Sequence, residues 1–82
     1  MPRASAPEGV LETLKACVFE LVEDHKRPPT LLEVQEVWDK KRPDEKLSLG
    51  AIQYWLEILV TRGELKRLNT QKRKYAPISF HG

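Results

Sequence analysis

The side chains most suited to chemistry form a basic cluster near the C-terminus. Five cations fall within nine positions, with Glu64 as the one acid near them: Lys66, Arg67, Lys72, Arg73 and Lys74. Ammonium and guanidinium groups bind phosphate oxygens through charge-assisted hydrogen bonds, so this density of cations favours contact with a polyanion. The alternative is a solvated edge strand on which the charges prevent aggregation between strands.

The cluster dominates the charge distribution of the chain, although the formal net charge of the 82 residues is only +2. Residues 1–61 hold 8 basic and 11 acidic side chains, a balance of −3. Residues 62–82 hold 6 basic and 1 acidic side chain, a balance of +5. This asymmetry indicates that the C-terminal end is the part that contacts a polyanion.

Catalytic and metal-binding patterns are absent from the sequence. It has no Gly-rich phosphate loop and no paired His and Cys, and His25 and His81 lack partners at the spacing of metal ligands. A length of 82 residues accommodates one small domain, which excludes most enzymes of familiar size. We therefore expect a protein that is not an enzyme and that uses no cofactor, metal or small-molecule substrate.

Cysteine content and hydropathy predict the compartment. Cys17 is the single cysteine, so no intramolecular disulfide can form, and its place on an apolar stripe predicts a core residue. The N-terminal residues lack the apolar core of a signal peptide, and no stretch approaches the ~20 apolar residues of a membrane span. We expect a soluble protein of the reducing cytoplasm, without a membrane partner.

Three helices are expected to precede the basic cluster. Apolar residues recur at helical spacing over about 8–24, 31–40 and 48–62. Pro28 and Pro29 end the first helix, since proline cannot continue a helical hydrogen-bond ladder. The apolar stripes include both tryptophans, which we expect in the core.

The ends of the second and third helices carry recognisable capping residues. Thr30 and Glu33 have the spacing of a capping box at the start of the second helix. Ser48 is a good N-cap for the third helix, and Gly63 stands where a left-handed residue ends a helix. The amide-rich start of the second helix, after Arg27 and Thr30, is also expected to donate to a phosphate.

A β-hairpin with a basic tip is expected to follow the helices. Strand-like runs at 64–68 and 75–80 flank the basic tip, and Pro77 confines the second run to a sheet edge. The predicted fold class is therefore α+β: a small winged helix-turn-helix of three helices and a C-terminal hairpin wing. Its parts are a flexible N-terminal arm over 1–8 and the domain over 9–80.

The outward face of the third helix is polar but carries no Lys or Arg. Gly50, Gln53, Tyr54, Glu57 and Thr61 fall on one exposed surface, which suits entry into the roughly 12 Å major groove of DNA. Gln53 suits a bidentate contact with adenine, or else is a solvated residue. Tyr54 suits a thymine methyl or a phosphate, or else covers the edge of the hairpin.

Several of these motifs resemble those of the DNA-binding domain of the LexA repressor family. The resemblance is carried by Arg27-Pro28-Pro29-Thr30 before Leu32-Glu33-Val34, by Ser48 with Ala51 and Leu56, and by Leu59, Arg62-Gly63 and Leu65. It covers about residues 10–78. It implies three helices with a small antiparallel sheet, and DNA sequence read by the front half of the third helix. The self-cleaving part of that family is not implied.

The sequence thus predicts a double-stranded DNA-binding protein, a small transcriptional regulator with helix 48–62 in the major groove and wing 64–80 on the phosphate backbone. A homodimer on a two-fold site, or a larger protein complex, is expected. The expected DNA contacts, including the reading positions that the resemblance implies, are Arg27, Thr30, Ser48, Gly50, Ala51, Gln53, Tyr54, Lys66, Arg67, Thr70, Lys72, Arg73 and Lys74.

A winged-helix protein-interaction module is the alternative, acting on a polymerase, a replication protein or another regulator. The face of the third helix without cations, the carboxylate of Glu57 and the acidic balance of residues 1–61 favour this alternative. An RNA or single-strand binder would need exposed aromatic platforms. Trp38 and Trp55 do not supply them if they are buried.

Overall fold

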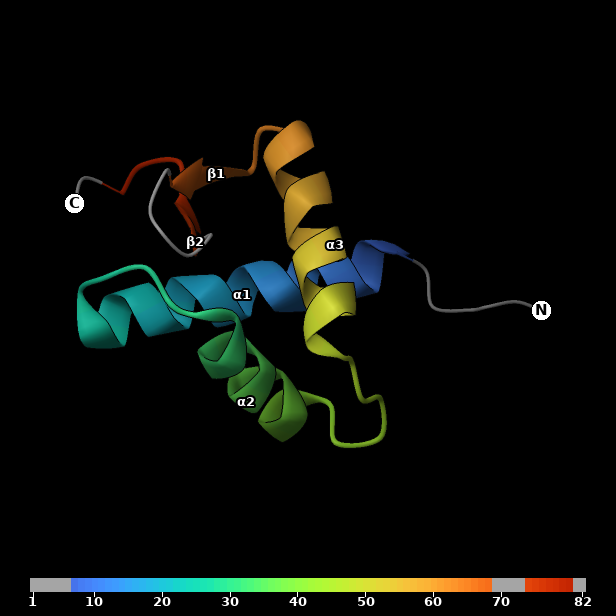
Figure 1. Cartoon of the computed structure of the whole chain (residues 1–82). Coiled ribbons are helices and arrows are strands. Elements are labelled where there is room, and N and C mark those ends of the chain that lie inside the picture. Colours follow the sequence, from blue (N-terminus) through green and yellow to red (C-terminus); the bar gives the residue numbers. More distant parts are fainter. Residues whose placement is uncertain (1–6, 69–73, 81–82) are drawn as a thin grey trace.

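Three helices followed by an antiparallel hairpin confirm the expected α+β fold class (Figure 1). The structure is a computed structural model that describes residues 7–68 and 74–80, with side chains from residue 9 onward. Among the expected DNA contacts, Thr70, Lys72 and Arg73 lie outside the described residues. The elements are α1 (Pro7–His25), α2 (Leu31–Lys41), α3 (Leu49–Thr61), β1 (Leu65–Leu68) and β2 (Lys74–Pro77).

The long helix α1 supplies one whole side of the core. Its apolar stripe is buried, and Leu14, Cys17 and Val18 are fully enclosed. The full burial of Cys17 confirms it as a core residue, and the same burial raises the pKa of its thiol to about 11. The helix begins at Pro7, one residue before the expected start, because proline suits the first position of a helix.

Helices α2 and α3 pack on α1 and on each other (Figure 1). The capping box of α2 is confirmed: the Thr30 hydroxyl accepts from the Glu33 amide (3.2 Å), and the Thr30 amide donates to the Glu33 carboxylate (2.9 Å). At the far end of α2, Arg42 donates to the Gly9 carbonyl oxygen and to the Thr13 hydroxyl of α1. The charged segment after α2 therefore begins with a structural cross-link to α1.

The ends of α3 also match the sequence prediction. The Ser48 hydroxyl accepts from the Ala51 amide (3.1 Å). Gly63 has φ +81°, the Gly63 amide donates to Val60 O (3.0 Å), and the Glu64 amide donates to Leu59 O (2.9 Å). These bonds form a Schellman motif, which turns the chain out of α3 and directly into β1.

The hairpin packs on α1 and α3 through its buried side chains. β1 and β2 pair antiparallel with Leu65 opposite Pro77 and Leu68 opposite Lys74. Leu65 and Tyr75 are nearly fully buried. The ladder ends at Pro77, and the Phe80 amide donates back to the Pro77 carbonyl oxygen (3.0 Å). The predicted second strand over 75–80 is therefore too long at its C-terminal end, because residues 78–80 follow this turn.

Both tryptophans belong to the core, as predicted. Trp38 is fully buried, and its Nε1 donates to the Glu45 carbonyl oxygen (2.5 Å). Trp55 is partly buried against the same hydrophobic cluster. Across the described part of the chain, no helix is long and apolar enough to cross a bilayer.

Candidate nucleic-acid interface

The first two turns of α3 form an open surface. Ser48, Gly50 and Tyr54 are exposed, while Ala51 and Gln53 are half-exposed. The space outside Gly50 is empty, since a Cβ added there would meet nothing within 4 Å. The structure therefore leaves all five expected reading positions accessible in the first two turns of α3.

Tyr54 is the most prominent side chain on this face. The Tyr54 residue is 60% exposed. Its ring lies edge-on to the Trp55 ring, with the ring centroids 5.0 Å apart and the ring planes at 71°. Edge-to-face packing against a core-facing tryptophan holds the ring while leaving its hydroxyl accessible to solvent. The exposure favours the outward role of Tyr54 over a role as a cover for the hairpin.

Glu57, which was expected on the exposed face of α3, is half-exposed, and its carboxylate is bonded to the hairpin. The Tyr75 hydroxyl donates to Glu57 Oε2 (2.5 Å), and the Arg67 guanidinium donates to Glu57 Oε1. One carboxylate thus contacts both strands of the hairpin. The sequence carries no signal for this cluster, because its members are 10 and 18 residues apart and meet only through the hairpin register.

The two basic residues of β1 point to opposite sides of the hairpin, since neighbouring strand residues alternate between faces. Arg67 faces α3, where the hydrogen bond that it donates to the Glu57 carboxylate raises its pKa. Lys66 faces the other way: its Nζ donates to the Phe80 carbonyl oxygen (2.5 Å) and lies 5.9 Å from the Phe80 ring centroid. The described part of the basic cluster is therefore divided between two faces.

Lys74 begins β2, directly opposite Leu68 in the register. Its side chain is half-exposed at the end of the ladder that adjoins the connection between the strands. Of the five basic residues in the cluster, the structure describes Lys66, Arg67 and Lys74. The first two are engaged within the chain, so Lys74 is the described member best placed for an external phosphate.

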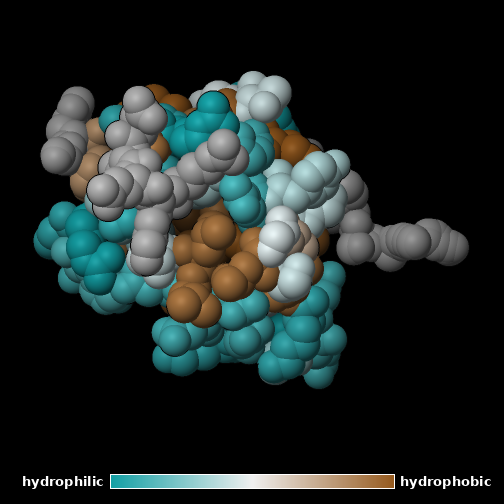
Figure 2. All heavy atoms as spheres, viewed as in Figure 1, coloured by the Kyte–Doolittle hydropathy of each residue, from teal (hydrophilic) through white to brown (hydrophobic). Residues whose placement is uncertain are grey.

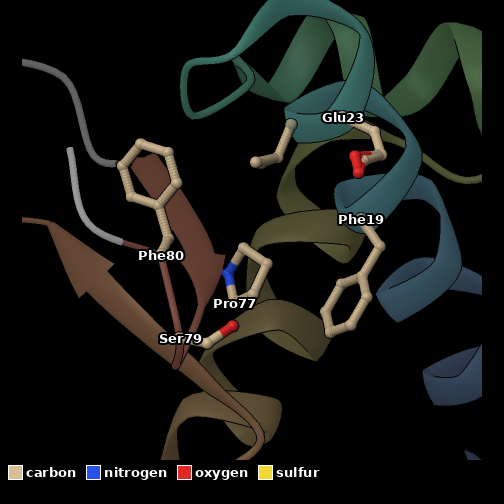
Figure 3. A pocket seen from close by; sticks show the side chains of 6 residues that line it. Phe19, Glu23, Pro77, Ser79 and Phe80 are labelled. Atoms are coloured by element: carbon tan, nitrogen blue, oxygen red, sulfur yellow. The ribbon is translucent and has the colours of Figure 1, made fainter.

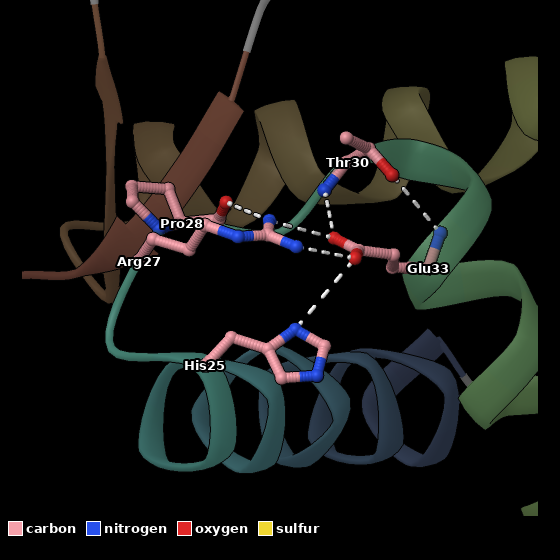
Figure 4. Close-up of polar contacts among 5 residues, drawn as sticks. All are labelled: His25, Arg27, Pro28, Thr30 and Glu33. Atoms are coloured by element: carbon pink, nitrogen blue, oxygen red, sulfur yellow. Dashed lines mark hydrogen bonds and ion pairs between the residues drawn. The ribbon is translucent and has the colours of Figure 1, made fainter.

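Arg27 and Thr30 meet at the start of α2, around a carboxylate (Figure 4). The Arg27 guanidinium donates to both oxygens of Glu33, at 3.2 and 2.9 Å, and His25 Nδ1 lies 3.6 Å from Glu33 Oε2. Arg27 and the Thr30 amide together lower the pKa of Glu33 to about 2. A carboxylate of the protein itself therefore accepts from one amide at the helix N-terminus where a phosphate contact was expected, and the phosphate contact stays a prediction.

The face shown in Figure 2 combines an apolar centre with a hydrophilic surround. The apolar region lies near the start of α2, beside α3 (Figures 1 and 2). Leu32 in the first turn of α2 is 58% exposed, and Leu49 at the start of α3 is 37% exposed. The helix-turn-helix surface can therefore make apolar as well as hydrogen-bonding contacts.

A separate apolar groove lies between α1 and the residues at the end of β2 (Figure 3). Phe19, which is 45% exposed, faces Phe80 across Pro77, with Glu23 at the rim. Sequence reasoning missed this groove because its two sides come from distant segments. No residue of α3 lines it.

Groups of acidic, histidine and cysteine side chains that could hold a metal ion are not found in 7–68 and 74–80. Comparison with protein-family models, curated proteins and solved structures found no match for this chain. The resemblance to the LexA family therefore stays a prediction.

Proposed function

We propose that this protein binds double-stranded DNA as a small transcriptional regulator, with α3 in the major groove and the hairpin wing on the adjacent backbone. The observation that carries the proposal is the open face of α3 next to the hairpin. That hairpin belongs to the C-terminal segment in which the positive charge of the chain is concentrated. The resemblance to LexA-type domains supports the same function.

The shape of α3 suits a DNA groove. A helix with its side chains is about 10–12 Å across, and the major groove is about 12 Å wide, so small residues on the entering face favour a close approach. Gly50 and Ala51 provide such a face, and Gln53 next to them suits a bidentate contact with adenine. Because α3 carries no Lys or Arg, its contribution is base contact and not phosphate attraction.

The wing supplies the phosphate attraction. With Lys66 bonded to the Phe80 carbonyl oxygen and Arg67 bonded to Glu57, the remaining cations of the cluster are Lys72, Arg73 and Lys74. Three phosphate contacts predict a log-log salt slope of about −2.7, at ~0.9 for each phosphate. This is a weak to moderate dependence, which suits a domain that binds as two copies on a two-fold site.

Fluorescence anisotropy with duplex DNA over a range of salt concentrations tests the proposal. Replacing Lys72 and Lys74 with Gln should weaken binding to every duplex alike and reduce the slope by about 1.8. The matched control replaces the exposed Lys26 and Lys40, which lie outside the proposed contact surface, and should leave the slope unchanged. Loss of affinity for one sequence only would contradict the phosphate role of the wing.

A protein-interaction module is the second candidate. It is favoured by the face of α3 itself, where Leu49 and Tyr54 are exposed and no cation accompanies them. The same titration separates the two candidates, since an absence of affinity for any duplex at low salt would leave the protein partner. A DNA partner, together with a fully buried single cysteine, agrees with the cytoplasmic location expected from the sequence.

A further inference from the structure

Glu57 joins the three elements of the proposed interface at one point. Its carboxylate projects from α3 and accepts from Tyr75 on β2 (2.5 Å) and from Arg67 on β1. Arg67 and Tyr75 are direct partners in the antiparallel register, so a single side chain of α3 contacts a cross-strand pair. The Tyr75 residue is 1% exposed, and the Glu57 side chain is 30% exposed.

The position of this contact along the hairpin allows Glu57 to fix the orientation of the hairpin against α3. A two-stranded hairpin has little stability of its own, so its orientation depends on what it packs against. Leu65 anchors the start of β1 in the core, next to the Schellman turn. Glu57 contacts the hairpin near its other end. Arg67 is the next-to-last residue of β1, and Tyr75 is the second residue of β2.

The charge of Glu57 bears on the proposed contact with DNA phosphates. An unpaired carboxylate at this position would repel the DNA backbone, but the ion pair with Arg67 neutralises it. The Arg67 nitrogen that neutralises Glu57, Nη1, is thereby engaged, although the side chain is 46% exposed. Arg67 cannot give the same hydrogen bond to a phosphate while Glu57 accepts it.

We infer that Glu57 is a positioning residue, which holds the wing against α3 through both strands and keeps Arg67 from serving as a phosphate ligand. This inference rests on the proposed DNA binding. It assigns Arg67, one of the expected DNA contacts, to the wing anchor instead. It also makes Glu57 a determinant of specificity, because it withholds a cation that would strengthen binding to any sequence.

Salt dependence tests the inference through two single variants and their combination. Arg67→Ala should have the same slope of log affinity against log salt concentration as the wild type, because Arg67 makes no phosphate contact in the proposed complex. Glu57→Gln keeps an oxygen for the Tyr75 hydroxyl but removes the charge that holds Arg67. Its slope should steepen by about 0.9, which is an additional loss of about 3.5-fold in affinity between 50 and 200 mM salt.

The double variant and a control complete this experiment. Glu57→Gln with Arg67→Ala should return to the wild-type slope. Glu36→Gln makes the same change of charge at an exposed position of α2 and should not steepen the slope. The inference is overturned if Arg67→Ala alone reduces the slope by about 0.9, since Arg67 would then contact phosphate in the presence of Glu57.

A measurement without DNA separates this inference from the proposed function. Residual dipolar couplings of the backbone amides report the orientation of the hairpin relative to the helices. In Glu57→Ala, the couplings of 65–68 and 74–76 should depart from the wild-type orientation, while those of α1 and α2 are kept. Unchanged hairpin couplings would refute the positioning role, and a failure of the wild type to bind any duplex would refute the proposed function instead.

Discussion

Glu33 shows how one side chain can occupy a site that a ligand was expected to fill. Its carboxylate completes the capping box of α2 and accepts from the Arg27 guanidinium. The arrangement needs no partner from outside the chain. It makes the start of α2 a structural anchor within the chain.

The lowered pKa of Glu33 makes part of the stability depend on pH. The folded pKa of about 2 lies below the ordinary value of 4.5, so the stabilisation is fully present above pH 4.5 and is lost as the pH falls toward 2. Glu33→Gln should reduce the free energy of unfolding by about 1–2 kcal/mol at pH 7, a value discounted for partial exposure. The difference between variant and wild type should shrink toward pH 2.

Urea unfolding followed by circular dichroism at pH 7, 4 and 2.5 measures this difference. The comparison with Glu33→Gln is needed because Glu64, which Lys15 holds by a hydrogen bond, also has a lowered pKa. A difference that stays constant from pH 7 to 2.5 would show that the Glu33 carboxylate does not contribute as a charge.

Sequence reasoning at the residue scale succeeded where partners are close along the chain. Thr30 and Glu33 are three residues apart, and helical geometry alone brings them together. The contacts of Glu57 were missed, because they depend on how the hairpin lies against α3. The sequence predicted Glu33 in the capping box, but it did not predict that Arg27 donates to the same carboxylate.

At the scale of elements, the capping residues at the two ends of α3 determine where this helix begins and ends. Ser48 caps its N-terminus, and Gly63 adopts the left-handed conformation that its C-terminus requires. Local signals of this kind predicted the helices to within about two residues. The end of β2 was harder to predict, because the apolar residues after Pro77 continue a strand-like pattern although the chain turns there.

Replacing Gly50 of α3 and Gly63 of its C-terminal turn with alanine should change the free energy of unfolding in opposite directions. Gly63→Ala should reduce stability by about 1 kcal/mol, because φ is +81° and no steric contact adds to the cost. Gly50→Ala should raise stability by about 0.5–1 kcal/mol, because it lies in a helix with open space around it. The midpoint of urea unfolding measures both, and equal effects of the two variants would contradict this account of α3.

At the scale of the whole molecule, the fold depends on polar links between segments that are far apart in sequence. Lys15 of α1 donates to Glu64 at the turn after α3 (2.7 Å), and Arg42 joins the end of α2 to the start of α1. These links also change the meaning of the charge distribution. The +5 of residues 62–82 already counts Glu64 against a cation, but Glu57, which lies outside that segment, pairs with Arg67 and lowers the local balance to about +4.

The central claim is that α3 and the wing contact the same DNA duplex. Its most direct test is the titration of isotope-labelled protein with a duplex obtained by selection from random sequences, followed by amide chemical shifts. The account predicts the largest shifts in 48–61 together with 64–75. Shifts confined to 64–75 would contradict base reading by α3, and the absence of shifts in both segments would contradict DNA binding by this surface.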